Sequence, residues 1–396
     1  MLTKINVTEL NHRLNAFCGI MDSTYPDWDT GLIINRVNQY YFTGTMQDGL
    51  LVIKKDRTGY YFARRSYERA KDESLFLNIY PMESYRDAVK VIGAECGNTY
   101  LELEVVPVAM LERLKKYFSM PSIRGLDQEI SLTRAVKSPY ELERMINSGK
   151  LHKEILTNIV PSLLTEGMSE ADLVVDLYAH MVKIGHHGVS RFAMFQNEIV
   201  CGQIGFGESS LYPTNFDGPG GAYGMSPAVP VLGSRERKLK KGDLVFVDIG
   251  FGVDGYHTDK TQVYQFGAKP SPDVIAAHRG CIEVENRLAE QLMPGAIPSV
   301  IYALVMNSLS TQFLQNFMGY GKRQVKFLGH GIGLNVDELP VIANGFDLPL
   351  QQNMVIALEP KKGIQNVGMV GVEDTYTVTP NGGNCLTGGG SDIIIV

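Results

Sequence analysis

The chain has few cysteines and no long apolar segment. Its five cysteines are scattered over 396 residues, and none of them belongs to a Cys-x-x-Cys pair. An odd, scattered set fits reduced and mostly buried thiols, which argues against a disulfide framework or a zinc knuckle. No run approaches the roughly 20 apolar residues that a membrane helix requires, and the amino-terminal residues lack the apolar core of a signal peptide. We therefore expect a cytoplasmic protein without a membrane partner.

An excess of positive charge is also absent. The chain carries 37 lysines and arginines against 43 aspartates and glutamates, which is a formal net charge of −6. This balance leaves no basic footprint for nucleic acid or for an anionic membrane surface, so nucleic acid is not expected as a partner. A length of 396 residues with 44% hydrophobic side chains allows a large core and favours two or three domains.

The first third of the chain has the pattern of a small mixed α/β domain. Residues 49–53 and 60–63 are apolar runs on either side of a short turn that ends in glycine, which predicts a hairpin. Residues 108–117 have a helical pattern that the preceding proline can open. The periodic pattern is interrupted over residues 121–135, so we expect the first domain to span residues 1–133.

The second domain, residues 134–396, alternates helix pairs with strands. Its first helix begins with a capping box, in which Ser138 and Glu141 each bond the other's backbone, and Pro139 takes the first helical position. Helix starts are expected at residues 138, 169, 271 and 298. Strands follow each helix pair, so the same order of elements occurs twice. This repetition predicts a curved antiparallel sheet with helices on its outer face. The expected fold class is therefore α+β.

Residues 244–264 read as a central β-hairpin, with apolar and aromatic runs on both sides of a glycine-rich turn. Asp248 and Asp259 are eleven residues apart, so a turn between Val253 and Asp254 would set them directly opposite each other. Opposed Cβ atoms lie roughly 4.5–5.5 Å apart, and two carboxylates at that distance repel unless they share a proton or a cation. The pair predicts a metal site or an acid/base dyad, although an aspartate near glycine is equally typical of a solvated turn.

A second pair of acids occurs near the carboxyl end. Residues 354–360 form an apolar run that ends in Glu359 and a proline, and the proline stops further strand pairing. Residues 370–378 form another strand that contains Glu373. A turn centred on Asn366 would place the two glutamates opposite each other.

One histidine lies between these two hairpins. His330 stands in the sequence Gly-His-Gly-Ile-Gly, where the glycines let backbone and ligand approach closely. A lone histidine or strand-end acid is commonly structural, but four acids and one imidazole on glycine-bounded apolar segments indicate a metal site. Such an oxygen-rich set suits Mn, Fe, Co or Zn, and five ligands of this kind can bridge two ions.

Together these residues resemble the metal-binding pattern of the pita-bread metallopeptidases, in the branch of prolidase, aminopeptidase P and creatinase. The resemblance covers nearly the whole chain. It implies a small creatinase-like amino-terminal domain and a pita-bread catalytic domain with a curved antiparallel sheet. It also implies the metal ligands, which are Asp248, Asp259, His330, Glu359 and Glu373.

By the same resemblance, the activity is that of a dinuclear metal-dependent hydrolase of the Xaa-Pro peptidase type. Its cofactors would be two divalent ions (Mn, Co, Zn or Fe), and its substrate a small peptide or small amide. Asp248 and Asp259 would hold one ion, and His330 would cap the other. Asp259 and Glu373 would bridge the ions, while Glu359 would also accept the proton of the attacking water as the catalytic base. Members of this branch are generally homodimers, so we expect a homodimer.

The chain departs from the family pattern in residues that handle the substrate. Asp337 stands seven residues after His330, where a histidine is usual. Gly371 stands where the prolidase branch commonly has an arginine. We expect Asp337 to bind substrate, because its negative charge near the cleft would favour a molecule with an amine or another cationic group. The alternative is that Asp337 faces solvent or caps the next turn.

Two further features concern the walls of the cleft. The family also has a histidine upstream of the first ligand strand, but residues 189–255 contain none, so His186 or His187 would have to serve as its displaced equivalent. Residues 202–233 are rich in glycine, proline and aromatic residues. Loops of this length are often functional, so this segment is expected either to line the cleft or to be an inert surface loop.

Three functions remain open from the sequence. The first is a dinuclear peptidase acting on Xaa-Pro bonds. The second is a metal-dependent hydrolase or lyase of the same fold that acts on a small non-peptide compound, which the altered substrate-handling positions favour. The third is a non-catalytic binding module on this fold, which loss of metal ligands would indicate, and none of the five ligands is lost.

Overall fold

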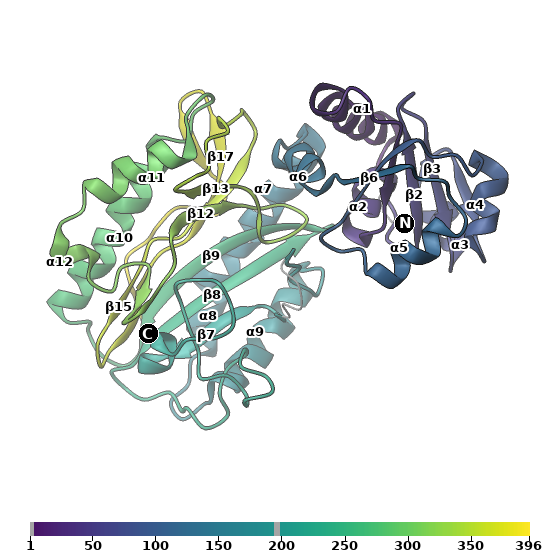
Figure 1. Cartoon of the computed structure of the whole chain (residues 1–396). Coiled ribbons are helices and arrows are strands. Elements are labelled where there is room, and N and C mark those ends of the chain that lie inside the picture. The colour runs from purple at the N-terminus through teal and green to yellow at the C-terminus, as the bar shows by residue number, and fades with distance from the viewer. Residues whose placement is uncertain (1–3, 194–198) are drawn as a thin grey trace. The chain divides into compact units, whose positions relative to one another are not determined.

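The computed structural model describes residues 4–193 and 199–396 (Figure 1). The chain forms two compact units, Met1–Arg134 and Ala135–Val396. Within the described residues, no helix is both long enough and apolar enough to cross a bilayer.

The first unit is built on a six-stranded mixed sheet with the order β4-β3-β2-β1-β5-β6. The expected hairpin is confirmed, since Gly49 lies opposite Ala63 and Val52 opposite Tyr60. The pairs β3–β4, β1–β5 and β5–β6 are parallel, whereas β1–β2 and β2–β3 are antiparallel, so the unit mixes both kinds of pairing. The strands are β1 (Thr30–Ile33), β2 (Gly49–Lys54), β3 (Gly59–Ala63), β4 (Ile79–Pro81), β5 (Asn98–Leu101) and β6 (Ser122–Gly125).

Helices cover this sheet and close its core. Leu32, Phe62, Leu101 and Leu114 are among the buried side chains that pack between strands and helices. The expected helix after Pro107 is present as α5, and its N-cap is that proline. The helices are α1 (Val7–Thr24), α2 (Arg36–Thr43), α3 (Tyr67–Glu73), α4 (Tyr85–Ile92), α5 (Val108–Lys115) and α6 (Asp127–Ala135).

The second unit contains two main ladders of strands. One has the order β19-β9-β8-β7 and the other the order β13-β12-β14-β17-β18, while β15–β16 and β10–β11 are separate two-stranded ribbons. The strands are β7 (Gly202–Phe206), β8 (Leu244–Val253), β9 (Tyr256–Gln265), β10 (Gly319–Tyr320), β11 (Arg323–Gln324), β12 (Phe327–Gly331), β13 (Glu338–Ala343), β14 (Val355–Leu358), β15 (Lys361–Ile364), β16 (Gly368–Gly371), β17 (Asp374–Thr379), β18 (Gly382–Cys385) and β19 (Ile394–Ile395).

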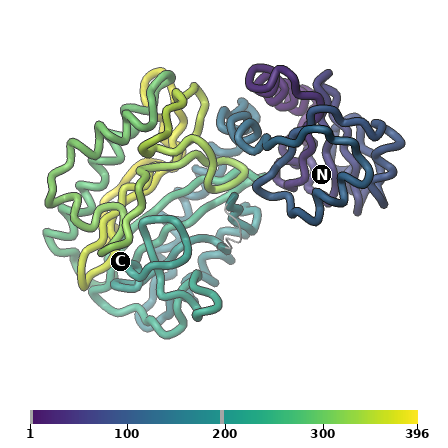
Figure 2. Tube along the Cα trace, viewed as in Figure 1, coloured from purple at the N-terminus to yellow at the C-terminus, as the bar shows by residue number. Residues whose placement is uncertain are grey.

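The two ladders lie side by side, although their strands are about a hundred residues apart in the sequence (Figure 2). An isolated β-bridge between Thr261 on β9 and Glu373 joins them. Helices α7 and α9 pack against β7–β9, whereas α10 and α11 pack against the β12–β18 ladder (Figure 1). This is the expected curved sheet with helices outside. The helical segments are α7 (Pro139–Glu154), a π-helical turn (Ile155–Ile159), α8 (Val160–Leu163), α9 (Glu170–Ile184), a 3-10 turn (Gly207–Leu211), α10 (Pro272–Glu290), α11 (Pro298–Asn307) and α12 (Thr311–Leu314).

The helix starts expected in this unit are confirmed. The Ser138 side chain accepts from the backbone of Glu141 at the start of α7, and both halves of the capping box are present. Ser169 forms a second capping box at the start of α9, and the Ser271 side chain caps α10. These caps satisfy backbone donors that no carbonyl within the helix can reach.

The central hairpin is present, but its register differs from the expected one. Asp254 and Gly255 form the two-residue turn, with φ angles of 50° and 93°. An Asp-Gly pair with positive φ at both positions suits the tight turns that match the twist of paired strands. This turn lies one residue later than expected, so Asp248 faces Thr261, and Asp259 faces Gly250. The two aspartates are therefore diagonal neighbours on one face rather than directly opposed.

The other acid-bearing hairpin has the expected register but is interrupted. Lys361 pairs with Gly371 and Ile364 with Gly368, so the turn is centred on Asn366 and Glu359 lies level with Glu373. The strand expected over residues 354–360 ends at Leu358, and the expected linker forms the further strands β15 and β16; the strand expected over residues 370–378 is broken at residues 372–373. Pro360 explains the end at Leu358, because proline cannot donate to a ladder.

Candidate metal centre

Five side chains that the sequence pattern singled out come from three places in the sheet. Asp248 and Asp259 belong to β8 and β9, and both are buried. His330 lies on β12, paired with Ala357 of β14. Glu359 and Glu373 lie at the breaks just described and are also buried. The curvature of the sheet brings residues 125 positions apart to one concave site.

Three of these residues form a cluster that can hold a metal ion. One ligand atom each from Asp259, His330 and Glu373 lies within 4.8 Å of the other two. Glu359 adjoins this cluster, since its Oε1 atom is 3.6 Å from Nε2 of His330. An imidazole with several carboxylates is a donor set that suits Mn, Fe, Co or Zn.

Asp248 is connected to the cluster through a hydroxyl and an ammonium group. Thr261 donates to Oδ1 of Asp248 over 2.8 Å and also lies 3.3 Å from Oε2 of Glu373. The other oxygen of Asp248, Oδ2, accepts a hydrogen bond from Nζ of Lys361 over 2.9 Å.

Lys361 is a site residue that the sequence reasoning missed. Its ammonium nitrogen lies 2.9 Å from Oε2 of Glu359 and 2.6 Å from Oε2 of Glu373, in addition to its contact with Asp248. The side chain is 1% exposed. A signal was available, because residues two apart in extended chain point to the same side, and Lys361 follows Glu359 by two.

The buried charges perturb one another's protonation. Burial raises the pKa of Glu359 to about 8, although Lys361 opposes the shift. Burial also raises the pKa of Asp248 to about 6, again against the effect of Lys361. The pKa of Glu373 is lowered to about 2, because Lys361 and His330 outweigh the effect of burial. Of the three carboxyl groups, Glu373 is therefore the one that stays ionised to the lowest pH, because it lies between Lys361 and His330.

A pocket opens onto these residues from solvent. Its open space, together with the solvent at its mouth, is about 390 Å³. Residues of the glycine-rich segment 202–233 line this pocket, which was one of the two roles expected for the segment. The segment begins as strand β7 rather than as a loop. The lining residues are Phe192, Ile199, Cys201, Gly202, Gln203, Phe216, Asp217, Asp248, Gly250, Asp259, His330, Asp337, Glu359 and Glu373.

Asp337 lies in this pocket beside the histidine. Its Oδ1 atom is 3.7 Å from Nδ1 of His330, and its side chain is 35% exposed. Nδ1 of His330 also contacts the carbonyl oxygen of Gly331 over 3.1 Å. Partners on Nδ1 leave Nε2 free to face Glu359 and Glu373, which is how metal-binding histidines are commonly oriented.

His186 and His187 lie away from the pocket lining, near the tip of the central hairpin. The Nδ1 atom of His186 accepts a hydrogen bond from the backbone of Gly252. His187 accepts from the backbone of Gly255, and its Nε2 atom lies 3.2 Å from Nε2 of His257. Their rings hold the hairpin tip, so the described residues provide no displaced equivalent of the upstream family histidine.

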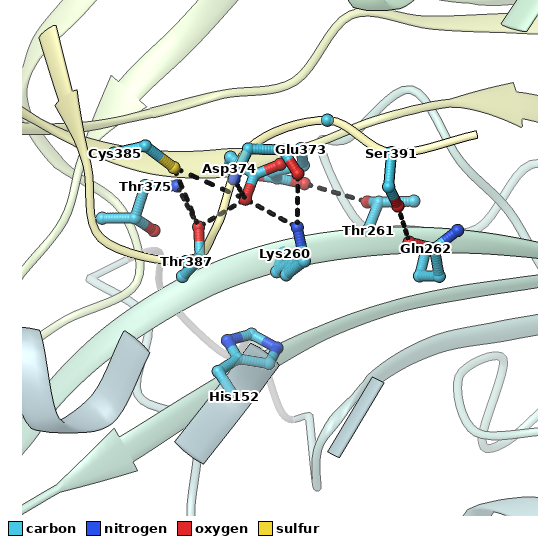
Figure 3. Close-up of polar contacts among 12 residues, drawn as sticks. His152, Lys260, Thr261, Gln262, Glu373, Asp374, Thr375, Cys385, Thr387 and Ser391 are labelled. Carbon is cyan, nitrogen blue, oxygen red and sulfur yellow. Dashed lines mark hydrogen bonds and ion pairs between the residues drawn. The ribbon is translucent and has the colours of Figure 1, made fainter. Parts of the chain in front are cut away.

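A second charge network is centred on the buried ion pair of Lys260 and Asp374 (Figure 3). Lys260 is the neighbour of Asp259, and Asp374 is the neighbour of Glu373, so strand alternation sends both to the other side. Nζ of Lys260 lies 2.6 Å from Oδ1 of Asp374, and the Thr387 hydroxyl donates to the same oxygen over 2.6 Å. This network joins β9 to β17 directly behind the candidate metal centre.

Fold and cluster together define a metal-dependent hydrolase. Residues 143–380 match the model of metallopeptidase family M24, and residues 20–136 match the creatinase/prolidase N-terminal domain. The chain belongs to metallopeptidase family M24. The resemblance inferred from the five-residue pattern is thereby confirmed, as is the pita-bread fold.

Curated relatives and solved structures agree with this assignment. The chain is 24% identical to an Xaa-Pro dipeptidase of Pyrococcus furiosus over 96% of this chain and 98% of that protein. It is 26% identical to an Xaa-Pro dipeptidase of Pyrococcus horikoshii over 96% and 97% of the respective chains. The fold is similar to that of the prolidase from Pyrococcus horikoshii OT3, with a TM-score of 0.78, 23% identity, and 97% and 100% of the two chains covered. It is also similar to the X-Pro aminopeptidase from Thermotoga maritima MSB8, with a TM-score of 0.75, 23% identity, and 93% and 98% covered.

Proposed function

We propose that this protein hydrolyses Xaa-Pro peptides with a divalent metal ion held by Asp259, His330 and Glu373. The single observation that carries the proposal is the convergence of these three side chains in the lining of one pocket, within the unit that matches family M24. The names of the relatives supply the Xaa-Pro substrate class. The donor set supports Mn, Co, Zn or Fe as the metal.

When bound, such an ion lowers the pKa of a coordinated water toward neutrality and polarises an amide carbonyl. The residues of this chain hold the reacting groups around it. Glu359 is the proposed catalytic base, because its Oε1 atom faces His330 while Lys361 holds its Oε2 atom. A carboxylate fixed in this way can accept the proton of the attacking water and later return it to the leaving amine. Replacement of Glu359 by Gln is expected to abolish turnover.

The pocket supports a preference at the substrate's carboxyl end. No lysine or arginine is found among the described residues that line it, and Asp217 and Asp337 both contribute negative charge. The free carboxylate that the proline of an Xaa-Pro dipeptide carries would meet this charge, and the ammonium of Lys361 is buried and already bound to three carboxylates. We therefore propose that tripeptides and longer peptides are better substrates than dipeptides, and that Asp337 favours a substrate with an amine or other cationic group.

A second candidate is a metal-dependent hydrolase or lyase that acts on a small non-peptide compound. Asp337 and Gly371, which stand where this branch usually has a histidine and an arginine, support it. A non-catalytic binding module is the weakest of the three functions, because all five expected ligands are buried around one site.

The decisive experiment is a substrate panel with the purified, metal-reconstituted protein. The panel contains Ala-Pro, Ala-Pro-Ala, Ala-Ala-Ala and a library of small amides, including cationic ones. Cleavage of Ala-Pro-Ala, slower cleavage of Ala-Pro and no cleavage of Ala-Ala-Ala would support the proposal. Cleavage of small amides alone would favour the second candidate. A kcat/KM for Ala-Pro above roughly 10⁴ M⁻¹s⁻¹, which is the ordinary enzyme range, would refute the preference against dipeptides.

We also propose the domain roles, assembly and location that the sequence suggested. Residues 1–133 would be the creatinase-like domain, and residues 134–396 the metallohydrolase catalytic domain. The protein would be a cytoplasmic homodimer, since symmetric dimers are the commonest assembly of soluble chains. Light scattering should then give about twice the chain mass of 43.8 kDa, and a monomer mass at micromolar concentration would contradict the dimer.

A further inference from the structure

The ammonium group of Lys361 lies among the carboxylates that the family pattern assigns to metal. Its nitrogen contacts Oδ2 of Asp248, Oε2 of Glu359 and Oε2 of Glu373 at 2.9, 2.9 and 2.6 Å. Three of the five expected ligands thus already share one cation that belongs to the chain itself.

The hydrogen-bonding capacity of this ammonium is fully used. A lysine ammonium has three donors and no acceptor, and Lys361 faces three carboxylate oxygens. A hard divalent ion would bind the same oxygens at roughly 2.0–2.6 Å, so an ion and the ammonium cannot both occupy the space between them. Asp248 shows which of the two expected ions is affected. It would be a ligand of only one of them, and its Oδ2 atom is the one that Lys361 contacts.

The backbone also makes room for this lysine. Gly371 lies opposite Lys361 in the β15–β16 ribbon and has a φ of 131°. A Cβ atom at position 371 would lie 2.4 Å from the carbonyl oxygen of Pro360, 2.6 Å from Cα of Lys361 and 3.1 Å from Cγ of Lys361. Any side chain at this position, such as the arginine common in this branch, would collide first with the backbone of residues 360 and 361 and would also crowd the stem of Lys361.

Glu373 divides the site into two halves. Its Oε2 atom is bound to Lys361, whereas its Oε1 atom lies 3.6 Å from Nε2 of His330. Asp259 completes the half that contains His330 and is within ligand range of both. The half with Asp259 and His330 is therefore open to an ion, while the half with Asp248 is filled by Lys361.

We infer that Lys361 takes the place of the second metal ion, so that each chain binds one divalent ion, at Asp259, His330 and Glu373. The inference rests on the metal centre of the proposed function but not on its substrate. It replaces the expectation of two ions. Lys361 acts as a positioning residue, because it supplies the positive charge that holds Asp248, Glu359 and Glu373 around the remaining ion.

The first test is the number of ions that the protein binds. The metal-free protein is titrated with Mn²⁺ by calorimetry, and the bound metal is measured by elemental analysis after dialysis. The wild-type protein should bind about one ion per chain. Lys361→Ala removes the ammonium and leaves the three carboxylates, so this variant should bind about two ions per chain. Its Mn²⁺ electron paramagnetic resonance spectrum should then be that of a coupled pair, whereas the wild-type protein should give the spectrum of an isolated ion.

Lys362→Ala is the matched control. Lys362 is the next residue, and its ammonium group donates to the carbonyl oxygen of Phe313 rather than to the site. This variant should bind one ion, like the wild-type protein. One ion in Lys361→Ala would show that the lysine does not exclude a second, and the inference would be wrong.

The second test does not depend on a variant that folds. Crystals of the wild-type protein soaked in Co²⁺ should show one anomalous peak, next to His330, with Nζ of Lys361 still bound to Asp248. Two peaks, or a displaced Lys361 side chain, would overturn the inference and leave the proposed peptidase activity intact. A complete lack of stoichiometric metal would overturn both, whereas one ion without peptide cleavage would count against the proposed substrate alone.

Discussion

Lys361 and Lys362 are adjacent in β15, yet their ammonium groups lie on opposite sides of the strand. Lys361 contacts the site carboxylates and is fully buried, whereas Lys362 is half-buried and donates to the carbonyl oxygen of Phe313. Alternation along a strand explains the difference. Two adjacent lysines therefore have unrelated roles. A substitution of one is a matched control for the same substitution of the other.

The cluster of Asp259, His330 and Glu373 predicts that metal binding depends on Asp259. Asp259→Asn should weaken binding by more than about 10–100-fold, the loss typical even of residues that only contact a ligand. Peptidase activity should fall with metal content. Asp176→Asn, on the exposed face of α9, is the control and should change neither. Full metal content in Asp259→Asn, measured by elemental analysis, would rule out its role as a ligand.

Asp337 predicts a change of substrate preference rather than a loss of metal. It lines the pocket and lies beside His330 but outside the three-residue cluster. Asp337→His replaces a negative charge with an imidazole, so it should raise kcat/KM for Xaa-Pro dipeptides relative to tripeptides while metal content stays constant. Steady-state kinetics on both substrates measure this. An unchanged ratio would mean that Asp337 does not contact the substrate.

The network behind the site predicts a difference between buried and exposed ion pairs. Lys260 and Asp374 are 4% and 0% exposed, whereas Arg279 and Asp392 are 61% and 64% exposed. Asp374→Asn leaves a buried ammonium without its counter-charge, which should lower the free energy of unfolding by about 3–5 kcal/mol. Asp392→Asn should lower it by about 1 kcal/mol or less, because solvent screens the pair. Urea denaturation compares the two, and equal losses would contradict this assignment.

Two helical glycines predict opposite responses to alanine. Gly149 in α7 has no room for a side chain, because its Cβ atom would lie 2.3 Å from the carbonyl oxygen of Leu386. Gly149→Ala should destabilise the protein by about 1–3 kcal/mol despite the better helix propensity of alanine. Gly19 in α1 has no atom within 4 Å of the same position. Gly19→Ala should stabilise the protein by about 0.5–1 kcal/mol, as measured by denaturation of each variant.

The buried histidines at the hairpin tip predict a loss of stability in acid. Burial, helped by nearby His257, lowers the pKa of His186 from 6.5 to about 4. Between these two pH values the unfolded chain binds a proton at His186 that the folded chain does not bind. The free energy of unfolding therefore has its full value above pH 6.5 and decreases as the pH falls toward about 4. The stacked ring of His187 faces the same group and its pKa is lowered as well.

His186→Asn keeps a hydrogen-bond acceptor but removes this titration. Between pH 6.5 and 4, the dependence of unfolding free energy on pH should become shallower by up to about 1.4 kcal/mol per pH unit. His180→Asn, on the partly exposed face of α9, is the control. Identical slopes for wild type and His186→Asn would show that His186 titrates alike in both states.

Local patterns of the sequence determined much of the architecture. Ser138 and Glu141, and the Ser169 cap, specified helix starts because capping depends on residues three apart. The turn centred on Asn366 was correct, since the flanking pairs place Glu359 level with Glu373. The acids and the histidine on apolar strands indicated a metal site, because burying carboxylates without compensation is costly. The family came from the resemblance of their pattern, which the family match confirmed.

Other features were decided by the tertiary structure. The turn at Asp254 and Gly255 shifted the hairpin by one residue, because positive φ at both positions fits this tight turn better than the symmetric one. The role of Lys361 could not be read from the lysine pair itself. Its ammonium is placed by the curvature that brings Asp248, from a strand more than a hundred residues away, against Glu373. Contacts between distant segments depend on how the two ladders meet at Thr261, and local sequence periodicity carries no information on that contact.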